Sequence, residues 1–193
     1  MSDIEQRAMR GASVQADGLR KLRGHAVVFD SMSEDLGGFR EIIAPDAVDR
    51  TLKEGLDVRA LVNHDRGKVI GRTTAGTLEL AKDRTGLRVL IEPDLEVSYA
   101  ADVMRSVSRG DISGMSFGFR VIEDDWNFDA PIAVRTVLDM KISEVSIVAW
   151  PAYTATNVEA AQRAMEECRS LHRKGSYRPS LAMLQRLHRQ RML

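Results

Sequence analysis

Residues 112–122 read ISGMSFGFRVI, and this stretch decides how the centre of the chain folds. Apolar side chains recur at positions 115, 117 and 119, which is the period of a strand with one face in a core. Gly114 and Gly118 fall on the opposite face, on either side of Ser116. Glycine inside a strand often marks a close approach by a ligand or another backbone. We therefore predict a long strand with a roomy serine, although curvature of a barrel strand also explains such glycines and, taken alone, is the commoner reason.

Working outward from this stretch, short strands and a few helices are predicted on both sides. Residues 1–20 show no sustained apolar period, and the acidic residues 123–125 indicate a turn. Predicted helices cover residues 46–52, opened by Pro45, then 97–109, about 157–171 and a basic amphipathic 181–192. The predicted strands are 22–30, 38–44, 58–63, 68–73, 77–81, 87–92, 112–122, 133–140 and 142–149. This pattern is typical of an α+β protein built on an antiparallel barrel or sandwich.

Charge divides the chain into a body and a tail. Residues 169–193 contain seven Lys or Arg and no acid, which leaves 21 basic and 28 acidic side chains on residues 1–168, a net of −7. A basic tail on an acidic body indicates an anionic partner, contact with its own body or simply a solvated extension. We expect a flexible N-terminal segment (1–20), a barrel domain (21–160) and a C-terminal helical basic tail (161–193).

Composition excludes several other classes of protein. No stretch of about 18 apolar residues is present, so we expect no membrane span, and residues 1–20 lack the apolar core of a secretory signal. Cys168 is the single cysteine, which excludes an internal disulfide and a cysteine-built zinc site. Phosphate-binding glycine motifs and metal-binding histidine pairs are missing, and few aromatic residues are available to stack on bases. The expectation is an intracellular, soluble protein without cofactor, metal or specific nucleic-acid partner.

Two further residues complete a set that could activate a serine. A serine hydroxyl needs a general base within hydrogen-bond reach, and His64 lies at a predicted strand end in the polar sequence NHDRG. Glu144 lies in KISEVSIVAWP, where an unpaired charge would be expensive to bury. A partner for this carboxylate could be an imidazole or a nearby arginine. Ser113 is the weaker nucleophile candidate and Asp139 is the reserve acid.

The ordered series NHD, ISGMSFGFR and KISEVSIVAWPA resembles the prohead (capsid maturation) protease family of tailed bacteriophages and of gene-transfer-agent particles. The resemblance covers residues 22–160 and includes GHAVVFD, FREIIAPDAVDRTL, VRALVNHD and TGLRVLIEPD. It implies a serine endopeptidase on a mostly antiparallel barrel of about seven to eight strands, similar to the herpesvirus assemblins. Carried over by position, His64 would be the general base, Ser116 the nucleophile and Glu144 the residue that orients the imidazole.

The resemblance also implies where the enzyme works and on what. The substrates would be the scaffold and the capsid-subunit precursors inside an immature prohead in the host bacterial cytoplasm, together with the chain's own ends. A homodimer is plausible, because assemblins dimerise through helices. Two alternatives remain: a catalytically silent assembly or scaffolding module, and an unrelated barrel that only binds and whose glycines serve curvature.

Overall fold

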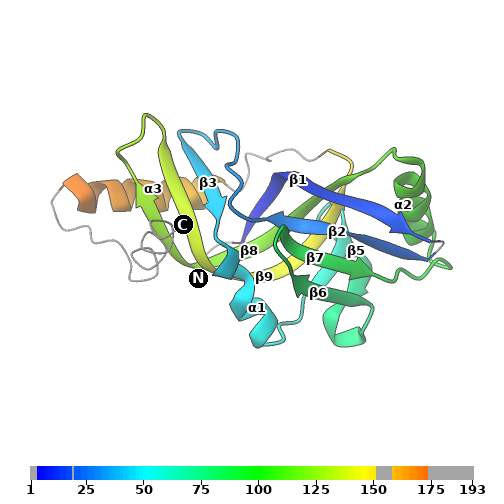
Figure 1. The fold of residues 1–193 in the computed structure, drawn as a ribbon. Coiled ribbons are helices and arrows are strands. Elements are labelled where there is room, and N and C mark those ends of the chain that lie inside the picture. The colour runs from blue at the N-terminus through cyan, green and yellow to red at the C-terminus, as the bar shows by residue number, and fades with distance from the viewer. Residues whose placement is uncertain (1–3, 19, 151–157, 174–193) are drawn as a thin grey trace.

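The computed structural model describes residues 4–18, 20–150 and 158–173. Within them one sheet contains all the strands, and Figure 1 shows it curling around the centre of the molecule. The strands are β1 (Glu5–Asp17), β2 (Lys21–Val28), β3 (Phe39–Ile43), β4 (Arg59–Val62), β5 (Asp65–Arg72), β6 (Leu78–Lys82), β7 (Gly86–Ile91), β8 (Gly114–Asn127) and β9 (Ala133–Val148). The helices are η1 (Pro45–Val48), α1 (Asp49–Lys53), η2 (Thr73–Ala75), α2 (Ser98–Arg109) and α3 (Val158–Arg173).

The sheet is a strongly curled half-barrel and not the closed barrel that was predicted. Its hydrogen-bonded path runs β5-β4-β9-β8-β1-β2-β7-β6, with β3 added beside β9. Closure requires every strand to pair on both sides, but β5 and β6 each pair with one neighbour and so form two edges. Most pairs are antiparallel, and only β3 and β4 run parallel to β9. The α+β class is confirmed.

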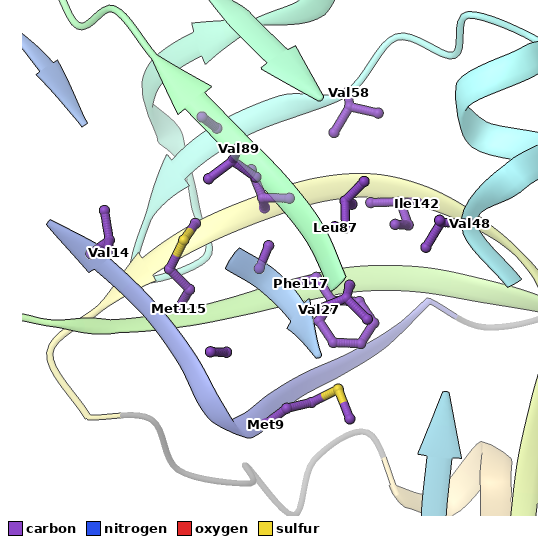
Figure 2. Packing of buried hydrophobic residues seen from close by; sticks show 14 of the residues in the cluster. Met9, Val14, Val27, Val48, Val58, Leu87, Val89, Met115, Phe117 and Ile142 are labelled. Atoms are coloured by element: carbon purple, nitrogen blue, oxygen red, sulfur yellow. The ribbon is translucent and has the colours of Figure 1, made fainter. Parts of the chain in front are cut away.

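The core lies on the concave side of the sheet and follows the period read from residues 112–122. Met115, Phe117 and Phe119 on β8 are completely buried. Figure 2 shows Met115 and Phe117 among apolar side chains from the neighbouring strands, including Val27, Leu87 and Ile142. Because apolar side chains alternate along β8, the opposite face of this strand is left for Ser116.

The hairpin of β8 and β9 is longer than predicted. Residues 123–125 continue β8 and are not a turn, and β9 is one strand where two were expected. The acidic residues fit inside a strand because their charge has a partner: Asp124 accepts a hydrogen bond from Arg135 on β9 at 2.7 Å. At the far end of this hairpin, Trp126 packs with Ala161 and Met165 of α3, which Figure 1 shows at the end of the molecule opposite α2.

Residues 5–17, expected to be part of a flexible N-terminal segment, form β1 between β8 and β2. The apolar period is hidden because two inward-facing residues of this strand are charged. Arg7 bonds Glu5 at 2.6 Å and Glu41 at 3.0 Å, and Arg135 bonds both carboxylates. These four side chains, at most 5 % exposed, form what we call the buried ion network. Burial alone would lower the pKa of Arg135, but Glu41, Glu5 and Asp124 outweigh it and raise that pKa.

Most of the remaining elements were placed correctly from the sequence, including the hairpin of β6 and β7 and helix α2. The expected helix at 46–52 is a 3-10 turn, η1, that leads into α1. The basic helix predicted at 181–192 and the linker before it lie outside the described residues. No helix in the described ranges is both long and apolar enough to cross a membrane.

Candidate active site

Ser116 lies near the beginning of β8, where this strand pairs with β1 on one side and β9 on the other. Its ladder partners are Ala8 on β1 and Ser146 on β9. The side chain faces away from the core, as predicted, but it is only 3 % exposed. Its hydroxyl donates a hydrogen bond to the carbonyl oxygen of Arg7 at 2.8 Å. The expected open position is therefore covered, because β1 lies alongside the serine.

His64 lies in a two-residue turn that joins β4 to β5. Val62 pairs with Asp65, so Asn63 and His64 form the loop, with φ of 50° and 59°. Positive φ at both central residues is the signature of a type I′ hairpin turn, which asparagine tolerates and histidine adopts less often. A strained residue of this kind persists only where its surroundings hold it in place.

Three hydrogen bonds hold this turn against β9. Asn63 donates its backbone N–H to Ile147 at 2.9 Å, and its side-chain oxygen accepts from the N–H of Ala149 at 3.0 Å. The backbone N–H of His64 donates to the hydroxyl of Ser146 at 2.8 Å. Ser146 is 1 % exposed and pairs directly with Ser116 in the β8–β9 ladder. The turn that carries the histidine is thus attached to the residue opposite the serine.

Glu144 reaches His64 from β9. Its Oε1 lies 2.7 Å from Nδ1 of the imidazole, and both side chains are mostly buried. An ionised carboxylate only accepts hydrogen bonds, so Nδ1 carries the hydrogen and Nε2 of the neutral ring is left as an acceptor. This arrangement prepares Nε2 to take a proton from a hydroxyl. The second carboxylate oxygen, Oε2, is buried and has no hydrogen-bond partner within the part of the chain that the structure describes.

The direction of Glu144 depends on a β-bulge. Gly118 pairs with Glu144 while Phe119 pairs with Ile142, so Ser143 is the extra residue. Strict alternation would place Ile142 and Glu144 on one face of the strand, and the bulge reverses the alternation between them. Ile142 points into the core and Glu144 points toward His64.

Gly118 is required by the same carboxylate. A Cβ placed on Gly118 would lie 2.5 Å from Oε1 of Glu144, closer than real Cβ contacts come. Gly118, on the same face of β8 as Ser116, has no side chain, and the carboxylate of Glu144 occupies the space that a side chain would need. That space is therefore not available to a substrate backbone.

A cavity of about 350 Å³ opens beside this group. It is lined by residues from β1 and the position before it, from β4, β5 and the turn between them, and from β9, namely Ile4, Gln6, Arg59, Leu61, His64, Arg66, Val69, Ser143 and Glu144. Ser116 is not part of the lining. No hydrogen bond joins Ser116 to His64 among the contacts of the described residues, because the hydroxyl is engaged by Arg7.

The two reserve candidates lie elsewhere. Ser113 is exposed just before β8, and its carbonyl accepts the N–H of Val14. Asp139 binds Arg50 through both carboxylate oxygens. Sequence reasoning did not single out Ser146 or the role of Gly118. The dipeptide Asn63-His64 between two strands is a recognisable signal for the turn, whereas the bonds across the sheet are not readable from the chain.

A family model described as Caudovirus prohead serine protease matches residues 4–170. This range contains His64, Ser116 and Glu144 and nearly all of the described structure. Comparisons with curated proteins and with solved structures find no match. The chain belongs to the caudovirus prohead serine protease family.

Proposed function

We propose that the chain is a serine endopeptidase that cleaves scaffold and capsid-subunit precursors during prohead maturation, and that it also cleaves itself. Family membership supports a capsid maturation protease acting in the prohead. The observation that carries the proposal is the contact between His64 and Glu144. His64 lies on a turn that is hydrogen-bonded to Ser146, and Ser146 is the ladder partner of Ser116. A carboxylate, an imidazole and a hydroxyl are the groups that nucleophilic hydrolysis of a peptide bond requires.

In this proposal Ser116 is the nucleophile, His64 the general base and Glu144 the orienting acid. The Ser116 hydroxyl leaves the carbonyl of Arg7, turns toward Nε2 of His64 and attacks the scissile carbonyl carbon while its proton passes to the imidazole. Glu144 stabilises the imidazolium, which then gives the proton to the leaving amine. Water, deprotonated by the same imidazole, hydrolyses the acyl-enzyme and restores Ser116.

The test is mass spectrometry of the full chain on incubation, beside Ser116→Ala and Ser113→Ala. We expect self-cleavage in the wild type and in Ser113→Ala, and none in Ser116→Ala. Processing that stops in Ser113→Ala and continues in Ser116→Ala would reassign the nucleophile. The substitution at Ser116 removes a single oxygen, so circular dichroism serves as the folding control.

A second candidate, a silent assembly module, is favoured by one observation. The hydroxyl of Ser116 is buried and donates its hydrogen bond to the carbonyl oxygen of Arg7, an arrangement that suits a structural serine with no catalytic role. A silent module predicts no processing of scaffold or capsid precursors in assembling proheads, whereas the protease predicts their cleavage there. Prohead assembly with wild-type and Ser116→Ala chains, followed by gel analysis of the precursors, separates these outcomes.

Other features stay predictions that accompany the proposal. They are the assemblin likeness, a homodimer, the host cytoplasm as the site of action, the absence of a specific nucleic-acid partner and a C-terminal tail that begins near residue 160. The basic tail is proposed to tether the protease to an acidic scaffold. Equal packaging of a chain truncated at Arg169 would contradict that role.

A further inference from the structure

The cavity beside His64 carries an excess of positive charge. Two guanidinium groups line it, Arg59 from β4 and Arg66 from β5. The one carboxylate in the lining, Glu144, is engaged by His64. Because residues 1–168 carry a net charge of −7, this positive site is local and does not reflect the charge of the body.

Arg59 is only partly neutralised by its neighbour. It bonds Asp57 at 3.0 Å, but the same carboxylate accepts two hydrogen bonds from Arg72, at 2.8 and 2.7 Å, and one from Thr74. The hydrogen bonds from Arg72 lower the pKa of Asp57 to about 2. One negative charge is therefore shared between two arginines.

Arg66 has no partner at all among the described residues. It is exposed, lines the cavity and makes no hydrogen bond or ion pair there. Lys68, the next outward basic residue on β5, bonds Asp65 at 3.3 Å and does not line the cavity. Arg66 follows His64 by two residues, and both side chains line the same cavity. Its guanidinium can therefore reach a group close to the reacting bond.

We propose that Arg66, assisted by Arg59, binds an acidic side chain of the substrate within two residues of the cleaved bond. This specificity site rests on the proposed function. A guanidinium offers paired donors that match the two oxygens of a carboxylate. The apolar lining from Ile4, Leu61 and Val69 suits an aliphatic neighbour of that acid. The selected substrates are peptides with Asp or Glu beside an apolar residue at the cut.

The experiment profiles cleavage of a mixed-composition decapeptide library by the full chain, with mass spectrometry of the products. We expect Asp and Glu to be enriched about threefold to tenfold at one position within two residues of the cut. Arg66→Gln should remove most of this enrichment, and Arg66→Glu should turn it toward Lys and Arg. Lys68→Gln is the matched control, because it removes one positive charge from the same strand outside the cavity.

The outcomes separate this inference from the proposed function. Cleavage without enrichment of acids, or equal loss of enrichment in Arg66→Gln and Lys68→Gln, overturns the acidic subsite and leaves the protease standing. If the wild type cuts no peptide, the acidic subsite is tested by binding: the same library is selected for affinity on the Ser116→Ala chain. Binding that favours acids and depends on Arg66 supports the subsite, and binding without such selectivity overturns it.

Discussion

On the β9 side of the candidate site, His64 and Glu144 already touch at 2.7 Å, whereas on the β1 side the hydroxyl of Ser116 is held by the carbonyl of Arg7. The β9 side is assembled by a strained turn, a bulge and an empty strand position. The β1 side is closed by a strand that the buried ion network anchors. In the proposed mechanism the base, His64, is thus ready before substrate arrives, whereas the nucleophile, Ser116, must first exchange its hydrogen-bond partner. The predictions below test the two sides separately.

The largest expected effect is on the β1 side. Arg7→Met removes one of the two guanidinium groups that neutralise Glu5 and Glu41 and leaves Arg135 alone with both carboxylates. One buried negative charge is then uncompensated, which costs about 3–5 kcal/mol of unfolding free energy. Because β1 is then held less firmly, a fluorophosphonate should label Ser116 faster. Urea unfolding and labelling rates measure the two effects. Arg10→Met is the control: Arg10 bonds Glu34 on the surface, where such a pair contributes about 0–1 kcal/mol. Similar stability losses in both variants would contradict the anchoring role of the network.

The next effect is on the β9 side. Gly118→Ala puts a methyl group 2.5 Å from Oε1 of Glu144 and should push the carboxylate away from His64. A displacement of about 1 Å can cost on the order of 100-fold in rate, so we expect kcat to fall by about that factor with little change in KM. The hydrogen-bonded Nδ1 proton of His64 should also shift in the NMR spectrum. Gly67→Ala is the matched control, since its added Cβ meets only the flexible side chain of Asp65, at 3.3 Å. An unshifted His64 resonance in Gly118→Ala would show that Glu144 can make room for the methyl group and still keep its hydrogen bond to His64.

Ser146→Ala should have a smaller effect on the same side. It removes the acceptor that holds the backbone N–H of His64 and leaves that donor unpaired, which costs about 1–3 kcal/mol. We expect kcat to fall about tenfold and the Asn63–His64 turn to exchange its amide hydrogens faster. Ser143→Ala also loses one hydroxyl bond, to the carbonyl of Gly118, and leaves the turn attached. Hydrogen exchange that is equally fast in both variants would argue against Ser146 as the anchor.

The smallest effect concerns Asp57, which binds Arg72 and also the cavity residue Arg59. The pKa of Asp57 is lowered from 3.8 to about 2, so its contribution to stability is full above pH 3.8 and is lost as the pH falls toward 2. Asp57→Asn should therefore flatten the acid limb of the stability curve between these values. Thermal unfolding at pH 2 to 5 measures it. Parallel curves for wild type and variant would show that the Arg72 hydrogen bonds contribute nothing.

Much of this arrangement could be read from local pattern. The alternation at residues 115, 117 and 119 predicted which face of β8 is buried, because each side chain in a strand is assigned to a face by its position alone. The same reasoning failed at Glu144, since a bulge adds one residue and reverses the alternation. It also failed for β1, where Glu5 and Arg7 look like surface residues until Glu41 and Arg135 are known to face them.

By itself, the sequence determined most of the strands and helices, the two faces of β8 around Ser116, and His64, Ser116 and Glu144 as the residues to examine. Only the tertiary structure decided that His64 and Glu144 meet, that Gly118 admits the carboxylate and that β1 closes over Ser116. The physical reason is the range of the interactions. Periodicity and turn chemistry act between residues a few positions apart, whereas these contacts join residues 80 and 109 positions apart, whose partners depend on the order and register of the strands.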